Sequence, residues 1–233
     1  PLRLVYTVVE AGNGKEGIEK AREIIPDLIV SDIMMPGIDG VELCRKMKTD
    51  IKTSHIPIIL LTAKASEQSI IQGLETGADD YITKPFNPKI LSVRVKNLIE
   101  LRRQLQQKIQ KQMLLQPAEI AVSSMDRQFI EEIQTAIDKN LSNSKFNVED
   151  LSKKLYMNRA TLYRKMMALT GEPPVDFIRS YRLKRAAQLL RDKFGTVSQV
   201  AIAVGFDNPA YFAKCFKEKF QQLPSSYQAS ESK

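Results

Sequence analysis

The run Leu28-Ile29-Val30-Ser31-Asp32 is mostly apolar and ends in one carboxylate. Two later runs have the same form: Ile58-Ile59-Leu60-Leu61-Thr62 ends in a hydroxyl, and Tyr81-Ile82-Thr83-Lys84 ends in an ammonium group. Short runs that are rich in β-branched and aromatic side chains predict β-strands. Together with Tyr6–Glu10, these runs give four predicted strands in the first half of the chain.

Amphipathic stretches alternate with the predicted strands. We expect helices at Gly14–Ile25, Gly40–Lys48, Glu67–Thr76 and from Asn87 onward. This alternation predicts a doubly wound α/β fold, in which a parallel sheet has helices on both faces. Ligands bind such sheets in the crevice at the carboxyl ends of the strands. Asp32, Thr62 and Lys84 are therefore expected to meet at one place.

These three side chains make chemical sense together. A carboxylate such as that of Asp32 can attack phosphorus and hold the phosphoryl group as an acyl phosphate. The Thr62 hydroxyl can donate to one phosphoryl oxygen, and the Lys84 ammonium can neutralise another. Mg2+ normally bridges carboxylate and phosphoryl oxygens in this chemistry. Any one of the three residues alone is more often a helix cap or a solvated group, so the prediction depends on the combination.

The composition is that of a globular protein, with 43% hydrophobic and 27% charged residues in 233. No apolar run approaches the roughly 20 residues of a membrane-spanning helix, and no secretory signal opens the chain. Cys44 and Cys215 lie far apart in helical patterns and predict neither a disulfide nor a metal site. We therefore expect a cytoplasmic protein whose two cysteines are buried apolar side chains.

The net charge of +8 is unevenly distributed along the chain. Residues 1–100 carry 13 Lys and Arg against 14 Asp and Glu, whereas residues 101–233 carry 22 against 13. A near-neutral half followed by a basic half indicates that the second half contacts a polyanion.

The second half contains helical patterns only and repeats itself at an offset of 50 residues. The alignment pairs Leu151 with Ala201, Leu155 with Gly205, Tyr156 with Phe206, Asn158 with Asn208, Leu162 with Phe212, Arg164 with Lys214 and Met166 with Phe216. Each copy is predicted to be a helix, a short turn and a second helix. Asn147 and Thr196 are expected to cap the first helices, and Asn158 and Asn208 the second.

In a helix-turn-helix unit, the second helix lies in the major groove and presents its outward residues to base edges. The outward residues are predicted to be Arg159, Ala160, Tyr163 and Arg164 in copy one, and Ala210, Ala213 and Lys214 in copy two. Arg164 can make a bidentate contact to guanine, so copy one is expected to dominate specificity. Phosphate contacts are expected from Lys153, Lys154, Lys165, Lys217 and Lys219.

The segment Asp32-Ile33-Met34-Met35-Pro36-Gly37-Ile38-Asp39-Gly40, with Thr62 and Lys84-Pro85 downstream, resembles a response regulator receiver domain over residues 1 to about 103. The resemblance implies a flavodoxin-like fold with Asp32 as the phosphoacceptor and the Met34 backbone carbonyl as a Mg2+ ligand. It also implies that Thr62 and Tyr81 switch position on phosphorylation and that Lys84 contacts the phosphoryl group. The Lys84-Pro85 peptide is expected to be cis.

The chain departs from the receiver pattern at its start. Receivers open with a strand that ends in an acidic pair, which provides most of the Mg2+ coordination, and this first strand is missing from the chain, which starts at Pro1-Leu2-Arg3-Leu4. We therefore expect weak or absent Mg2+ binding by Asp32 and Met34, and we expect that the natural protein has further residues upstream.

Residues 125 to about 227 resemble the AraC family DNA-binding domain. The signature is carried by Arg182-Leu183-Lys184-Arg185-Ala186, Gly205-Phe206, Tyr211-Phe212-x3-Phe216-Lys217 and Pro224-x2-Tyr227. The family usually has Gly where this chain has Gln221, so the helix that ends there needs a left-handed residue other than glycine or a different cap. Two such units, joined by the helix Phe177–Leu190, suit two successive major-groove faces of double-stranded DNA.

These resemblances predict three segments: a truncated receiver at residues 1–103, a helical connector and linker at residues 104–124, and an AraC-type DNA-binding domain at residues 125–233. The connector is either a plain helix or a short coiled-coil seam, and Gln116-Pro117 is expected to end it. The order of parts is similar to the C-terminal end of hybrid two-component sensors. The only histidine, His55, lies in a loop, so a histidine kinase upstream on the same chain or separate is expected as phosphodonor.

Three functions remain open at this point. The first is a transcription regulator controlled by phosphorylation of Asp32, a homodimer when active, cytoplasmic or the cytoplasmic end of an inner-membrane sensor, and no enzyme beyond its own phosphoryl transfer. The second is a phosphorylation-independent DNA binder whose degenerate receiver serves only for dimerisation. The third is a hydrolase of the haloacid-dehalogenase type, which would need an Asp where Met34 stands.

Overall fold

The computed structural model describes residues 2–63, 76–112 and 123–230. The chain divides into two compact units. The first contains residues 2–111 together with two short stretches, residues 123–129 and 164–171. The second contains residues 130–163 and 172–230. The predicted boundaries at residues 103 and 124 stay a prediction.

A parallel three-stranded sheet lies at the centre of the first unit, in the order β1-β2-β3 for the described residues. The strands are β1 (Ile29–Asp32), β2 (Ile58–Thr62) and β3 (Asp80–Thr83). Asp32 lies beside Leu61 of β2, and Thr62 lies beside Thr83 of β3. The three predicted strands are confirmed to within one residue, and their carboxyl ends meet at one edge of the sheet.

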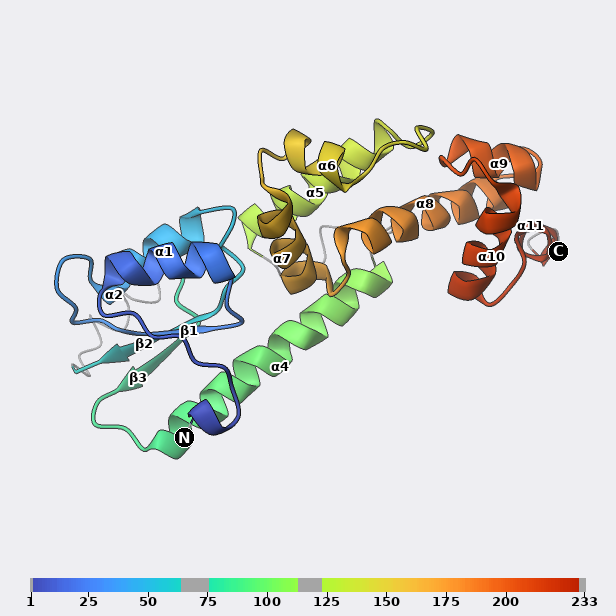
Figure 1. The fold of residues 1–233 in the computed structure, drawn as a ribbon. Coiled ribbons are helices and arrows are strands. Elements are labelled where there is room, and N and C mark those ends of the chain that lie inside the picture. The colour runs from blue at the N-terminus through green and yellow to red at the C-terminus, as the bar shows by residue number, and fades with distance from the viewer. Residues whose placement is uncertain (1, 64–75, 113–122, 231–233) are drawn as a thin grey trace. The chain divides into compact units, whose positions relative to one another are not determined.

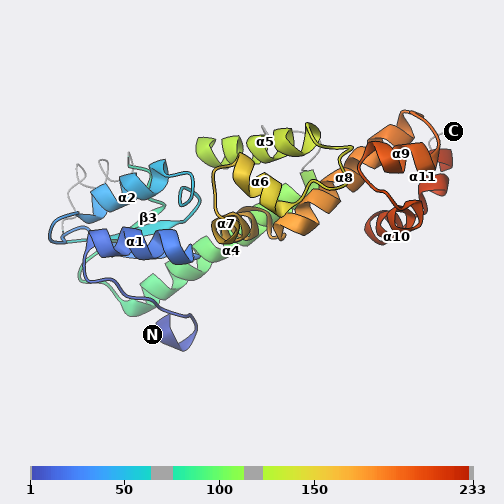
Figure 2. The same cartoon turned by 45° about the horizontal axis from the view of Figure 1, so that its top comes forward.

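Helices cover both faces of this sheet (Figures 1 and 2). The helices α1 (Gly14–Ile24) and α2 (Gly40–Thr49) lie on one face, and α4 (Pro88–Gln112) lies on the other. This arrangement confirms the doubly wound fold. The predicted helix at residues 67–76 and the predicted stop at residues 116–117 fall on residues that are almost wholly outside the described ranges.

Side chains of β2 point alternately into two apolar clusters, because successive residues of a strand face opposite sides of the sheet. Ile58 and Leu60 pack with Cys44 and Met47 of α2, and all four are fully or almost fully buried. Ile59 packs on the opposite side, in a cluster that includes residues of α4. A strand buried on both faces explains why residues 58–61 form a continuous apolar run.

The predicted strand at Tyr6–Glu10 is wrong. A short 3-10 helix, Leu2–Leu4, is followed by a turn and then by residues 7–11, which pair with no strand of the described chain. A β-strand exists only when a neighbouring strand accepts and donates its backbone hydrogen bonds. Val8 and Val9 are accordingly exposed, at 40% and 55%.

The second half of the chain is entirely helical over residues 124–230, apart from its turns. Its helices are α5 (Ser124–Asp138), α6 (Val148–Lys154), α7 (Arg159–Thr170), α8 (Pro174–Arg191), α9 (Val197–Ala203), α10 (Pro209–Phe220) and α11 (Pro224–Ser230). No helix of the described residues is long and apolar enough to pass through a bilayer.

The predicted helix starts are confirmed by their caps. Asn147 and Thr196 accept backbone hydrogen bonds in complete capping boxes at α6 and α9. Asn158 accepts from the Thr161 N–H, and Asn208 caps α10 in the same way. At the end of α10, Gln221 adopts the left-handed conformation (φ 58°), which confirms that this position uses a strained non-glycine residue.

The internal repeat has a different register from the one predicted. Tyr156 (φ 51°) is equivalent to Gly205 (φ 79°), because each follows its first helix in the left-handed conformation and bonds back to the same position in that helix. The next residues, Met157 and Phe206, are buried to the same extent, at 8% and 7%. The predicted match of Tyr156 with Phe206 is therefore wrong.

The offset changes within the turn. It is 49 residues through α6 and α9, as the equivalence of Tyr156 and Gly205 shows, and 50 residues from Asn158 and Asn208 onward. The second turn thus contains one additional residue, Asp207. An alignment without a gap conceals this insertion, because it pairs one aromatic residue with another at the wrong place.

Gly40 fixes the backbone next to Asp32. Its N–H donates to the Ile33 carbonyl at 3.0 Å, and α2 begins at this residue with Asp39 as its N-cap. A Cβ at position 40 would lie 2.3 Å from the Asp32 carbonyl oxygen, which is backbone and has no room to move. Only glycine lets α2 start this close to the end of β1.

We expect Gly40→Ala to lower the free energy of unfolding by about 1–3 kcal/mol, because the added methyl forces α2 away from β1. Urea denaturation measures the change. Gly12→Ala is the matched control, since its Cβ would meet nothing closer than the Glu16 carboxylate at 3.4 Å. Equal losses in the two variants would show that the close approach at Gly40 is not responsible.

Candidate phosphoacceptor site and nucleic-acid interface

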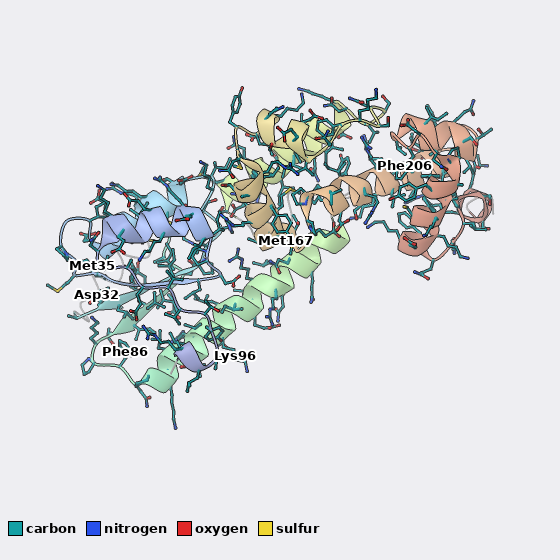
Figure 3. All side chains as sticks on the ribbon, viewed as in Figure 1. Asp32, Met35, Phe86, Lys96, Met167 and Phe206 are labelled. Carbon is teal, nitrogen blue, oxygen red and sulfur yellow. The ribbon has the colours of Figure 1, made fainter. Side chains whose placement is uncertain are left out.

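Asp32 and Lys84 form an ion pair at the carboxyl end of the sheet. The Lys84 ammonium contacts Oδ2 of Asp32, and the Met34 N–H donates to Oδ1 at 3.1 Å. Both side chains are open to solvent, at 34% and 38% exposure. Figure 3 shows Asp32 with Met35 and Phe86 at the end of the sheet toward which the strand arrows of Figure 1 point. The carboxylate is thus accessible, with a cation already placed beside it.

Thr62 lies next to this pair, whereas Tyr81 lies further back along β3. Thr62 ends β2 and is buried, and its carbonyl accepts from the Lys84 N–H at 2.7 Å. Tyr81 is half-buried against the cluster that α1 and α2 form on the sheet, and burial raises the pKa of its hydroxyl. The predicted cis peptide at Lys84-Pro85 is confirmed. The structure therefore brings Asp32, Thr62 and Lys84 together as predicted, while their roles stay predictions.

The outward face of α7 contains the residues predicted to read bases in copy one. Arg159 and Ala160 are exposed, Tyr163 is 49% exposed and Arg164 is half-buried. The opposite stripe, Leu162, Met166 and Leu169, is buried. This division agrees with a helix that is anchored on one side and exposes Arg159, Ala160 and Tyr163 on the other. The Arg164 guanidinium instead donates to the Glu23 carbonyl of α1, so it must leave that contact before it can reach a base.

The equivalent face of α10 has smaller side chains. Ala210 and Lys214 are exposed and Ala213 is half-buried. Tyr211, which sequence reasoning missed, is 49% exposed in the first turn of this helix. The equivalent residue of copy one is Thr161, which is buried, so the repeat does not indicate that position 211 faces outward. Tyr211 adds an aromatic hydrogen-bonding group to the predicted surface of copy two.

Lys165 is not available for phosphate, contrary to the prediction. Its ammonium is fully buried and forms an ion pair with Asp126 of α5 at 3.1 Å. It also lies 4.6 Å from the centre of the Phe129 ring, a cation–π distance. The sequence shows only a lysine in a basic helix, whereas the burial of Lys165 depends on distant residues: Asp126 in α5, and Ile51 and Ser54 in the first half of the chain.

Comparison with known families agrees with both halves of this description. Residues 3–96 match the response regulator receiver domain, and residues 151–230 match a helix-turn-helix domain. The chain is a receiver domain joined to an AraC-type helix-turn-helix domain.

Several known proteins are similar to all or part of this chain. Histidine kinase P4 of Formosa agariphila is 45% identical over 223 residues, which are 96% of this chain and 16% of that protein. Transcriptional regulatory protein ResD of Bacillus subtilis is 50% identical over 94 residues, 40% of this chain and 38% of that protein. The receiver domain of a signal transduction histidine kinase from Syntrophus aciditrophicus has a TM-score of 0.40 at 39% identity and covers 42% of this chain and 74% of that one. The chain thus spans less than half the length of the Formosa agariphila and Bacillus subtilis proteins.

Electrostatics in the receiver domain keep Asp32 ionised. The hydrogen bond from Lys84 has the largest effect and lowers the pKa of the Asp32 carboxyl. Burial raises that pKa by less, and the Met34 N–H lowers it by less again. An ionised carboxylate is the form that can act as a nucleophile. Lys84 therefore has two uses: it sets the protonation state of Asp32 and places a positive charge where phosphoryl oxygens would arrive.

The receiver domain offers few oxygen ligands for Mg2+. In the described ranges, no group of three or more His, Cys, Asp or Glu side chains gathers anywhere. Asp32 is paired with a lysine, and Met34 could add only its carbonyl. Mg2+ requires near-octahedral oxygen coordination. The described residues alone are a poor fit to the ion.

We expect Lys84→Met to raise the pKa of Asp32, because the variant removes the group that lowers it most. Titration of the Asp32 carboxyl carbon by NMR gives the pKa directly. Lys89→Met is the matched control, as Lys89 is an exposed lysine on α4. If the two variants titrate alike, the ion pair does not control the charge of Asp32.

For the helix-turn-helix domain, we expect Arg164→Ala to weaken binding to a duplex selected by the wild-type chain by about 1–3 kcal/mol and to relax preference at one base pair. Lys214→Ala should relax preference less, because copy one has more side chains that reach bases. Lys153→Ala is the phosphate control and should weaken all sequences alike, with a smaller salt dependence. Fluorescence anisotropy on single-base variants measures these effects. A uniform loss for Arg164→Ala would make Arg164 a phosphate contact.

Proposed function

We propose that the chain is a phosphorylation-controlled, sequence-specific DNA-binding transcription regulator of a two-component phosphorelay. The observation that supports this most directly is the Lys84–Asp32 pair at the carboxyl end of the sheet, in a chain whose second half contains two helix-turn-helix units. An accessible, ionised carboxylate with a cation beside it is suited to accept a phosphoryl group.

The chemistry proposed for the chain's own residues has one covalent step. A carboxylate oxygen of Asp32 attacks phosphorus, the bond from phosphorus to the donor breaks, and the donor leaves with its electron pair. Lys84 then pairs with a phosphoryl oxygen, because the carboxylate has lost its charge to the acyl bond. Thr62 follows by donating its hydroxyl, and Tyr81 moves with β3.

The added charge at Asp32 would change the conformation of β3 and α4, and this change would affect the DNA-binding half. The single negative charge of the Asp32 carboxylate, which is paired with Lys84, would be replaced by a phosphoryl group that carries up to two negative charges. A movement of Lys84 would also move Thr62, because the Thr62 carbonyl accepts a hydrogen bond from the Lys84 N–H. Ile90, Val93 and Leu101 of α4 are each 50% exposed or more, so this helix provides an apolar surface on which the active form would pair as a homodimer.

The proposed partners follow from this chemistry. Double-stranded DNA is the ligand of α7 and α10, which places the protein in the cytoplasm. A histidine kinase, on the same chain or separate, is the phosphodonor. Its presence on the same chain is supported by the similarity to a protein named as a histidine kinase, of which the match covers 16%. The receiver then catalyses only its own phosphorylation and is no enzyme toward other substrates.

A second candidate function is favoured by the ligand set. Because the described part of the chain contains no group of three or more His, Cys, Asp or Glu side chains that could hold a metal ion, a receiver that serves for dimerisation alone is the second candidate, with DNA bound irrespective of phosphorylation. The two functions differ in one observable, namely whether Asp32 takes up a phosphoryl group.

We expect the chain to take up one phosphoryl group from phosphoramidate with Mg2+, and Asp32→Asn to take up none while it stays folded. Intact-mass spectrometry detects the added group, and circular dichroism checks the fold. Asp39→Asn is the matched control, since asparagine keeps the helix cap while removing the other nearby carboxylate. Uptake by Asp32→Asn would move the site elsewhere, and a wild-type chain that stays unmodified would favour the second candidate.

A further inference from the structure

We propose that Arg182 is a positioning residue that holds the two helix-turn-helix units at one separation and thereby sets the spacing between the two DNA elements that the protein reads. This inference rests on the proposed DNA-binding function. The proposed role of Arg182 concerns the separation of the two units. Arg182 makes no base contact itself, because it is only 7% exposed.

Arg182 lies in the middle of α8, the helix that joins the two units. One guanidinium nitrogen donates to the Asn143 carbonyl at 2.6 Å, and the other donates to the Gly205 carbonyl at 3.1 Å. Asn143 belongs to the connection between α5 and α6, ahead of copy one, whereas Gly205 is in the turn of copy two. The planar fork of arginine thus bonds, at the same time, the segment that leads into copy one and the turn of copy two.

The two backbone segments that Arg182 bridges also approach each other directly. A Cβ at position 205 would lie 2.5 Å from the Leu141 carbonyl oxygen and 2.9 Å from Cζ of Arg182. Gly205 has φ 79°, so glycine meets both the conformation and the lack of space. The turn of copy two therefore packs against the α5–α6 connection that leads into copy one, and Arg182 bonds both segments.

The rest of α8 holds each unit by a separate set of interactions. On the side of copy one, the Tyr181 hydroxyl donates to Asp138 of α5 at 2.8 Å. On the side of copy two, Leu183, Ala186 and Leu190 belong to the apolar cluster around Phe206, which Figure 3 labels. These contacts keep each unit folded on the helix. Arg182 differs in bonding both units through one rigid group.

A rigid pair of reading helices should accept one spacing of DNA elements. Each added base pair moves the second element by roughly 3.4 Å and rotates it by about 35°, since a turn of DNA has about 10–10.5 base pairs. A joint that cannot adapt loses one of its two contacts after such a shift. A loosened joint tolerates the shift, at the cost of weaker binding to the preferred spacing.

The test is a selection from a pool of random-sequence duplexes with the 233-residue chain, its Arg182→Met variant and Arg185→Met as control. Arg185 lies on the same helix and carries the same charge, but its ion pair with Asp138 involves copy one only. We expect the wild type and Arg185→Met to enrich two elements at one spacing. Arg182→Met should enrich the same two elements over several adjacent spacings.

Two synthetic duplexes then quantify the effect, one with the selected spacing and one with a base pair inserted. We expect the insertion to weaken wild-type binding by about tenfold or more, which is the usual effect of losing a good base contact. For Arg182→Met the same insertion should cost at most a few-fold. Arg182→Lys keeps the charge and one possible bond, so it should give an intermediate result and remains measurable if the methionine variant does not fold.

The outcomes are distinguishable. If Arg182→Met or Arg182→Lys binds more weakly but keeps the wild-type spacing preference, the positioning role is overturned while the two-unit reading stands. If the wild type itself enriches a single element, the proposed two-unit recognition is wrong and the inference fails with it.

Discussion

The ion pair between Lys84 and Asp32 is the interaction on which the first half of the protein depends. Asp32 ends β1 and Lys84 directly follows β3. These strands lie on opposite sides of β2, so the contact spans the middle strand at the carboxyl end of the sheet. Its strength depends entirely on the negative charge of Asp32. A phosphoryl group on Asp32 changes that charge, and Lys84 must respond because its ammonium has no other carboxylate contact among the described bonds. The site therefore responds directly to a change in the charge of Asp32.

A cation bound by protein oxygen atoms also occurs in the helical half, with a different effect. Lys84 is open to solvent, so its contacts can be exchanged at small cost. Arg182 is buried and bonds two carbonyl groups of the backbone, which cannot change their charge. Removing such a buried group takes away the Arg182 donor of the Gly205 carbonyl, whereas the Asn143 carbonyl keeps its bond from the Phe146 N–H. The loss of a buried donor costs more than the exchange of an exposed contact. The exposed Lys84 is therefore suited to exchange its contacts, and the buried Arg182 is suited to keep them.

Much of the fold was predictable from the sequence because its signals are local. The strands at residues 29–32, 58–62 and 80–83 follow from β-branched runs, and the helix starts at Asn147 and Thr196 follow from their capping residues. The convergence of Asp32 and Lys84 also followed, since parallel strands bring their carboxyl ends together. The errors concern long-range effects. Tyr6–Glu10 has the composition of a strand but no neighbour in the described chain, and the additional residue at Asp207 is invisible without the turn geometry.

Buried cations show most clearly why composition overstates the DNA-binding surface. The excess of Lys and Arg over residues 101–233 includes Lys165 and Arg182, and the structure buries both. Lys165 joins α7 to α5 through Asp126, and Arg182 joins the two units through backbone carbonyls. Neither can release a counterion from DNA, so neither should contribute to the salt dependence of binding. Part of the basic character of this domain therefore orients the reading helices, and the groove-facing charge is correspondingly smaller than the sequence suggests.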